Sequence, residues 1–353
     1  APGPASGSGS LVRDAGRIVM AGFRGTTVEE TGRFADDLRS GRVGGVVLFD
    51  EDRAPDPRPH RNVVSPEQVR ALVVGLRALG PEPILVAVDQ EGGRVARFTE
   101  RHGFPATPSA RELGRSGDPG RTAGAAEVTA STLAALGVDL NLAPVVDLDR
   151  NPAGPAIGAA GRSYSPDPAV VTAHARAFVL AHRRRGVATV LKHFPGHGSA
   201  AEDSHLSMAD VTSTWSPDEL APYRSLIAEG LADAVMTAHV FHRDLDPDWP
   251  ATLSPAVVDG LLRRDLGFGG VVLTDDLQMG AIAGGHGLHT AVRQALLAGA
   301  DILLFANNSP GAYDEEAVPR AVAAVLDVVA RGEVPAQRVA EAASRVRRLA
   351  ARP

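Results

Sequence analysis

Eight short apolar runs recur along the chain, and longer amphipathic stretches separate them. This repetition constrains the fold more than any other feature of the sequence. The runs lie at residues 17–23, 43–49, 83–89, 138–149, 186–194, 233–240, 269–276 and 300–308. Their residues are nearly all apolar rather than alternately apolar and polar, which is typical of strands covered on both faces. We therefore expect a parallel sheet with helices packed on it.

The stretches between the runs carry helix signals. Residues 66–79, 119–137 and 166–186 are amphipathic, with a Pro near the start and a Gly at or just after the end. A further helix is expected before the seventh strand, at 251–268, and another at the C-terminus, at 334–351.

Eight strand–helix units predict an α/β fold, a single-domain (β/α)₈ TIM barrel. We place the barrel at residues 11–353, closed by its C-terminal helix, after a flexible leader at 1–10. A doubly wound sheet is the main alternative, but it usually has fewer strands and a Gly-rich phosphate loop after the first. The first run here leads into "GFRGTT", which lacks that pattern.

Composition limits the partners. The net charge is −6 and the pI about 6.0, which does not favour nucleic acid as a partner. The chain has no Cys, so disulfides and Cys-bound zinc are excluded. No apolar run approaches the ~18 residues of a membrane-spanning segment. The first ten residues do not resemble an export signal, which favours the cytoplasm, although a terminus left by cleavage would look the same.

Polar groups close six of the eight runs. Because the active site of such a barrel lies at the carboxyl ends of its strands, these groups are candidates for chemistry. They are Asp89, Asp147, Asp149, Lys192, His193, His239, Asp275, Asp276, Asn307 and Asn308. Asp275 and Asp276 are neighbours on a strand, so their side chains point to opposite sides and only one can face the mouth. The other is expected to cap a helix or to accept hydrogen bonds.

The stretch "KHFPGHGSAAEDSHLSM", at 192–208, follows the fifth strand. As a metal site it would use His193, His197, Asp203 and His205, at spacings that match no common zinc arrangement. As an acid–base device it would use Asp203 to orient His205, since side chains two apart on an extended loop lie on one side. The spacing alone does not separate this device from an ordinary polar loop.

Several motifs together resemble the family-3 glycoside hydrolases, and within them the single-domain β-N-acetylglucosaminidases. "KHFPGHGSAAEDSH" and "VVLTDDLQM" carry most of the resemblance, and the other motifs occur in the family order. These are "VDQEGGRVARF" (88–98), "NLAPVVDL" (141–148), "GRSYS" (161–165), "VMTAHV" (235–240) and "LLRRDLGFGG" (261–270). The chain has Gln278 where the family usually has Ser.

The resemblance implies a role for each matching residue. It makes Asp275 the nucleophile and His205 the general acid/base, with Asp203 as the partner of His205. It lets Gly196 and Gly198 move the loop. The residues implied to hold the hydroxyls of the terminal sugar are Asp89, Arg97, Arg162, Lys192 and His193. The cations among them are expected to set a positive field around Asp275 or to pair with the Asp residues at strand ends.

The implied activity is a retaining exo-β-N-acetylglucosaminidase that acts through a covalent glycosyl-aspartate. Its implied substrate is a short glycan such as a peptidoglycan fragment or muropeptide, and it needs no metal or organic cofactor. Only 4% of the residues are aromatic, which favours a pocket for one sugar over a long cleft with stacking platforms. Open alternatives are a β-glucosidase or broad β-hexosaminidase, a β-N-acetylglucosaminide phosphorylase, and a non-catalytic glycan-binding barrel.

Overall fold

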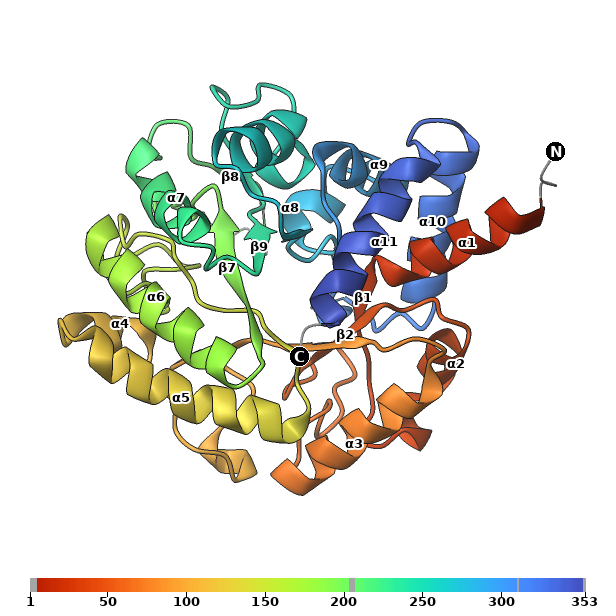
Figure 1. Ribbon diagram of the computed structural model, residues 1–353, viewed down its shortest axis with the longest axis horizontal. Helices are drawn as coiled ribbons and strands as arrows, with labels where there is room; N and C mark the ends of the chain where they lie inside the picture. Colours follow the sequence, from red (N-terminus) through yellow and green to blue (C-terminus); the bar gives the residue numbers. More distant parts are fainter. Residues whose placement is uncertain (1–4, 203–206, 310, 352–353) are drawn as a thin grey trace.

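A computed structural model describes residues 5–202, 207–309 and 311–351, and within them eight parallel strands form one sheet (Figure 1). The strands are β1 (Val19–Gly22), β2 (Gly45–Leu48), β3 (Leu85–Val88), β6 (Leu140–Asn141), β7 (Ala188–Phe194), β9 (Ala234–Thr237), β11 (Val271–Leu273) and β12 (Leu303–Phe305). Their spatial order is β11-β9-β7-β6-β3-β2-β1-β12. A parallel bridge between Leu273 and Ile302 joins the two end strands. The expected (β/α)₈ barrel is therefore confirmed.

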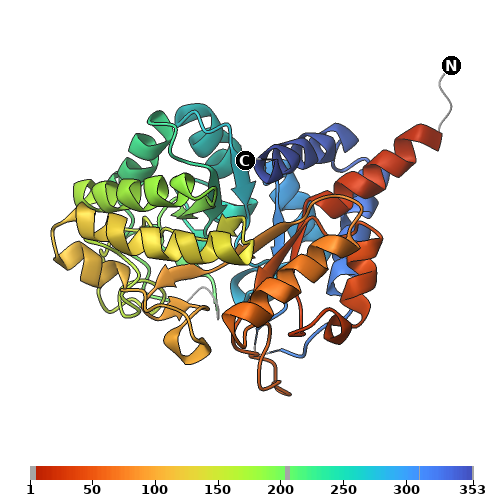
Figure 2. The same ribbon diagram turned by 60° about the horizontal axis from the view of Figure 1, so that its bottom comes forward.

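Helices surround the strands, as the two views in Figures 1 and 2 show. The α-helices are α1 (Ala5–Arg17), α2 (Arg33–Arg39), α3 (Pro66–Leu79), α4 (Ala110–Arg115), α5 (Pro119–Leu136), α6 (Pro168–Arg184), α7 (Ala221–Ala228), α8 (Gly280–Ala283), α9 (Leu288–Ala298), α10 (Ala317–Ala330) and α11 (Ala336–Ala350). Short 3₁₀ segments are η1 (Glu29–Thr31), η2 (Glu100–His102), η3 (Pro217–Leu220) and η4 (Ala251–Leu253). No helix in the described ranges is long and apolar enough to cross a membrane.

Helix α3 shows how the sequence sets an element's bounds. The Ser65 hydroxyl accepts a hydrogen bond from the Gln68 amide at 3.2 Å, and Pro66 occupies the first helical position. The buried face recurs at helical spacing, at Val69, Leu72, Val73 and Leu76. The helix therefore begins and ends where the sequence predicts.

The amino end of the barrel is covered by α11. Val346 and Leu349 of this helix belong to the same buried cluster as Met20 and Leu85 on the strands. Asp301, just before β12, accepts hydrogen bonds from Arg338 at 2.9 Å and Arg345 at 3.0 Å, both on α11. Since α11 covers this end, the opposite, carboxyl end is the one open to a substrate.

Two elements differ from their expected form. The helix expected at 251–268 is the 3₁₀ segment η4 followed by a π-helix, η5 (Ala256–Asp265). Pro255 separates them, because proline has no amide hydrogen to continue the first segment. The boundary expected at residue 10 falls inside α1, which continues through Leu11, packed against the core, to the buried Ala15.

Two small strand pairs lie beyond the barrel. Strand β4 (Gln90–Gly92) pairs antiparallel with β5 (Val95–Ala96), directly after β3. Strand β8 (Ala209–Asp210) pairs in parallel with β10 (Val240–Phe241). Both pairs follow the carboxyl ends of barrel strands and so build up the mouth of the barrel.

Candidate active site

A cluster of ion pairs lies at the carboxyl ends of β2, β3 and β7. The Lys192 ammonium, on β7, lies 2.8 Å from Asp89 Oδ1, just after β3. Arg97, after β5, donates to Asp89 Oδ2 at 3.4 Å and lies 3.9 Å from Asp50 Oδ1, after β2. The structure therefore brings together three of the five residues implied for sugar binding, and adds Asp50.

Glu91 connects Arg162 to Lys192, and the sequence motifs did not identify it as a site residue. Its carboxylate accepts hydrogen bonds from Arg162 Nε at 2.8 Å and Nη2 at 2.7 Å, and lies 2.7 Å from Lys192 Nζ. The spacing could have predicted it, because Glu91 lies two residues after Asp89 and side chains at that spacing point to the same side of an extended chain. The structure thus places Arg162 beside Lys192.

Charges inside this cluster shift each other's protonation. Burial alone would raise the pKa of Glu91, but Arg162 and Lys192 lower it to about 2. Burial acts likewise on Asp89, where Lys192 and Arg97 hold the pKa below its ordinary value. The Lys192 ammonium is buried, yet Asp89 and Glu91 raise its pKa. All these groups are therefore charged at neutral pH.

The cluster is electrically balanced. Four cations face four carboxylates: Arg97, Arg162 and Lys192 pair with Asp50, Asp89 and Glu91, and Arg101 pairs with both Asp50 and Glu51. Of the two expectations for the cations, pairing is therefore the one observed. A balanced, preorganised set of donors and acceptors is suited to hydroxyl groups, which both donate and accept.

His193 is fixed between two partners. Its Nδ1 lies 2.7 Å from Asp147 Oδ2, and its Nε2 lies 3.2 Å from Arg162 Nη2. Since the guanidinium can only donate, Nε2 accepts and Nδ1 carries the proton. A metal ion at Nε2 would have to displace Arg162, so this geometry disfavours the metal alternative.

His197 lies on the other side of Asp147. Its amide donates to Asp147 Oδ1 at 2.8 Å, and its side chain is buried. Burial and the neighbouring His193 lower the pKa of His197 to about 4, so the ring is neutral near pH 7. Asp203 and His205, the implied acid–base pair, lie outside the described residues.

Asp275 and Asp276, which follow β11, differ in burial and in hydrogen bonding. Asp275 is half-buried, and its Oδ1 accepts a hydrogen bond from the Asp276 amide at 2.8 Å. Asp276 is buried, and its Oδ1 accepts from the amides of Gln278 at 3.1 Å and Ala306 at 3.0 Å. Asp276 therefore has the acceptor role expected for one of the two. His239 supports the same turn, since its Nε2 lies 2.9 Å from the Asp276 carbonyl oxygen.

Gln278 joins this turn to the end of β12. Its Oε1 accepts a hydrogen bond from the Asn307 amide at 2.8 Å. Asn307 has φ of 51°, in the left-handed region that Asn tolerates better than most residues. Its side chain donates to the Asp314 carbonyl at 2.8 Å and accepts from the Asp314 amide at 3.0 Å. The longer side chain at 278 thus spans a gap between two loops at the mouth.

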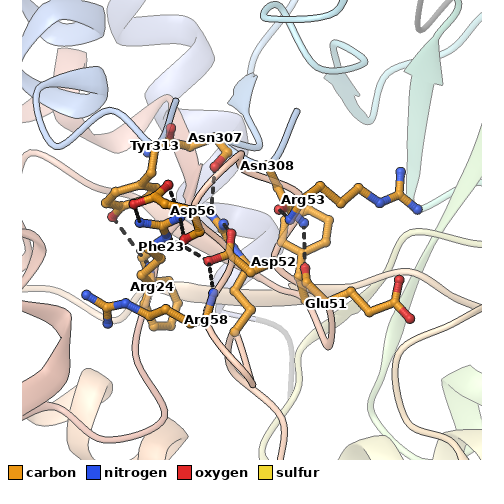
Figure 3. A network of polar contacts seen from close by, with 12 residues as sticks. Phe23, Arg24, Glu51, Asp52, Arg53, Asp56, Arg58, Asn307, Asn308 and Tyr313 are labelled. Carbon is orange, nitrogen blue, oxygen red and sulfur yellow. Dashed lines mark hydrogen bonds and ion pairs between the residues drawn. The ribbon is translucent and has the colours of Figure 1, made fainter. Parts of the chain in front are cut away.

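A second polar network fixes the neighbouring rim, where the loop after β2 meets the ends of β1 and β12 (Figure 3). Asp52 pairs with Arg24 at 2.8 Å and with the fully buried Arg61 at 2.8 Å. Arg61 also donates to the Asn307 carbonyl at 2.7 Å, and the Arg24 guanidinium lies 4.7 Å from the centre of the Tyr313 ring. The cavity beside them holds about 60 Å³, far below the ~300–1,000 Å³ of ligand pockets. We therefore assign this network to holding the rim.

The sequence is similar to those of known glycoside hydrolases. Residues 10–349 match the glycosyl hydrolase family 3 N terminal domain. A beta-hexosaminidase of Stenotrophomonas maltophilia is 38% identical over 329 residues, which cover 89% of this chain and 92% of that protein. One from Xylella fastidiosa is 41% identical over 296 residues, covering 81% and 82%.

Solved structures agree. A family 3 beta-N-acetylglucosaminidase from a Paenibacillus species superposes with a TM-score of 0.86 at 36% identity, covering 96% of this chain. This chain spans only 62% of that protein. A beta-N-acetylhexosaminidase from Beutenbergia cavernae superposes with a TM-score of 0.84 at 32% identity, covering 96% of this chain and 98% of that one.

Proposed function

Since the chain belongs to glycosyl hydrolase family 3, we propose that it is a β-hexosaminidase that releases one terminal β-linked N-acetylglucosamine from a short glycan. The observation that carries the proposal is the balanced cluster around Lys192, Asp89 and Glu91 at the open end of the barrel. It offers charged donors and acceptors in a fixed arrangement, with few aromatic residues for a longer chain of sugars to stack on. Peptidoglycan fragments are the natural substrates we propose.

The proposed reaction proceeds with retention, in two displacements. In the first, an Asp275 oxygen attacks the anomeric carbon while His205 gives its proton to the leaving oxygen, so the glycosidic bond breaks and a glycosyl ester forms. In the second, His205 takes a proton from water, the water oxygen attacks the anomeric carbon, and the ester bond breaks. Asp203 orients the His205 ring throughout.

Two features of the site support this assignment. Asp275 is a half-buried carboxylate on a rigid turn, held by the Asp276 amide at 2.8 Å. A His can supply the leaving-group proton near neutral pH, because its unperturbed pKa of about 6.5 lies close to the working pH. No step requires a metal or an organic cofactor.

The direct test uses the intact protein and nitrophenyl glycosides. We expect the β-N-acetylglucosaminide to be cleaved much faster than the β-glucoside, and the product to be free sugar whether or not phosphate is present. Faster glucoside cleavage would make the chain a β-glucosidase. Sugar 1-phosphate would make it a phosphorylase, which a His acid/base permits because it does not repel phosphate as a carboxylate would. Binding of the sugar without turnover would leave a glycan-binding barrel.

Replacing His205 by Ala should separate substrates by their leaving groups. On a glycan with a poor leaving group we expect kcat to fall by roughly 10²–10⁴, the usual contribution of general acid catalysis. An activated aryl leaving group needs little protonation, so the first step on that substrate should be nearly unchanged. Steady-state and pre-steady-state release of nitrophenol measure both effects. Equal losses on the two substrates would show that His205 is structural.

A further inference from the structure

A buried carboxyl group lies directly beneath residues 195–199, the loop that follows β7. Glu219, in η3, is only 1% exposed. Within the described parts of the chain, neither of its carboxyl oxygens has a hydrogen-bond partner. An unpaired ionised carboxylate in such a place costs several kcal/mol. The group therefore needs a physical explanation that the proposed reaction does not supply.

The loop packs closely on this carboxyl group. Gly196 has φ of 130°, and a Cβ at that position would overlap Glu219 Oε2. A Cβ at Gly198 would overlap the Leu148 carbonyl oxygen on the other side. These glycines therefore permit close approach between the loop and its supports, a role distinct from the loop movement that the resemblance implies.

Groups on several elements face Glu219. Asp147 approaches from the loop after β6, and the hydroxyl of the fully buried Tyr223 approaches from α7. The Ser199 hydroxyl and Gly198 amide lie close to the carboxyl group without reaching hydrogen-bond geometry. Two more groups act from a distance. Arg150 lowers the pKa of Glu219 and pairs with Asp218. His197 is linked to Glu219 through Asp147, which accepts a hydrogen bond from the His197 amide.

Burial and the Asp147 carboxylate raise the pKa of Glu219 to about 8. At neutral pH the carboxyl group is therefore protonated and uncharged. Asp147 is itself ionised, because His193 and His197 lower its pKa despite burial. Loss of the Glu219 proton would place two carboxylates side by side in a buried space, where like charges repel strongly.

We propose that Glu219 is a positioning residue, whose neutral carboxyl group lets residues 195–199 pack closely beside Asp147, and that its ionisation releases this loop. Asp147 is hydrogen-bonded to both the His193 ring and the His197 amide. Release of the loop therefore disturbs His193, and with it the sugar-holding cluster. The same loop leads along the chain to Asp203 and His205. The effect of Glu219 ionisation on turnover rests on the proposed function, but its effect on the loop does not.

The test uses Glu219→Gln, which keeps the shape of the side chain and cannot ionise. Glu341→Gln, an exposed carboxyl on α11, is the matched control. Trp215 reports on the loop directly, because its Nε1 donates to the Pro195 carbonyl at 3.1 Å. Replacing Trp249 by Phe in every protein leaves Trp215 as the only Trp of the chain.

In the parent protein we expect Trp215 fluorescence to change as pH rises through about 8, and Glu219→Gln to abolish that change. His242 packs against Trp215 in both proteins, so the difference between them isolates Glu219. We also expect kcat/KM of the parent to fall over the same range, and Glu219→Gln to move that fall upward by more than one pH unit while keeping near-normal turnover at pH 7. The control should match the parent.

A fluorescence change near pH 8 that survives in Glu219→Gln, or no change in the parent, would overturn the proposal. So would a folded Glu219→Gln protein that is inactive at pH 7, because the ionised form would then be the working one. If no glycoside is turned over but the fluorescence results hold, the proposed function fails and the role of Glu219 stands.

Discussion

Replacing Asp275 by Ala should abolish turnover of every glycoside, whatever its leaving group, with a loss on the order of 10⁴–10⁶ in kcat, as expected when the nucleophile of a covalent mechanism is removed. A better leaving group does not help, because the missing group is the one that attacks the anomeric carbon. This outcome contrasts with the expected result for His205→Ala, where an activated aryl group restores the first step. Single-turnover release of nitrophenol measures both variants.

Azide provides the sharpest check on this role. Removal of the carboxylate leaves space next to the anomeric carbon, and a small anion that enters it can attack in one displacement. We expect azide to restore nitrophenol release by Asp275→Ala and to give a glycosyl azide of inverted configuration, which NMR identifies.

The matched control is the neighbouring carboxylate. Asp276→Asn keeps an acceptor oxygen for the amides of Gln278 and Ala306, so its loss should be far smaller and azide should not change it. An Asp276→Asn variant as inactive as Asp275→Ala, or an Asp275→Ala variant that azide does not rescue, would contradict the assignment of the nucleophile.

The fold could be predicted because each element carries a strong local signal. Uninterrupted apolar runs mark strands that are covered on both faces, and Ser65 with Pro66 fixes the start of α3. The form of η5 could not be predicted in this way. A π-helix bonds each amide to the carbonyl five residues back instead of four, and ten residues are too few for the apolar pattern to separate the two forms. The choice between them depends on packing that the sequence does not state.

The site was predictable where side chains directly follow strands. Asp89 directly follows β3 and Lys192 lies near the carboxyl end of β7, so a barrel brings them to one mouth. Asp50 lies two residues after β2, and Glu91 lies two residues after Asp89, so the same argument could have predicted both. Glu219 was not, because it lies in a 3₁₀ segment between β8 and β9 and meets the site only through tertiary packing.

Glu91 allows the second large effect to be predicted, this time on stability. Its side chain is 5% exposed and faces two buried cations, Lys192 at 2% and Arg162 at 11%. In Glu91→Gln the amide cannot neutralise either cation, and breaking one side of a buried ion pair typically costs about 3–5 kcal/mol. We expect a loss of this order at pH 7, measured by urea unfolding, and a lower kcat/KM because Lys192 and Arg162 lose their shared anchor.

The stability contributed by the Glu91 charge should depend on pH. The folded protein lowers the pKa of Glu91 from 4.5 to about 2. The stability that its charge contributes is therefore fully present above about pH 4.5 and is lost as pH falls toward 2, on the order of 3 kcal/mol in total at 1.36 kcal/mol per unit. The difference between wild type and Glu91→Gln should accordingly shrink over the same range.

Glu51→Gln is the comparison that makes the measurement decisive. Glu51 also pairs with an arginine, Arg101, at 2.9 Å, but both side chains are more than half exposed. Solvent screens such a pair, so its removal should cost less than about 1 kcal/mol at pH 7. If Glu91→Gln lost no more stability than Glu51→Gln, the cluster would not be held together by its buried charges, and the sugar-binding role that we assign to its rigidity would lose its physical basis.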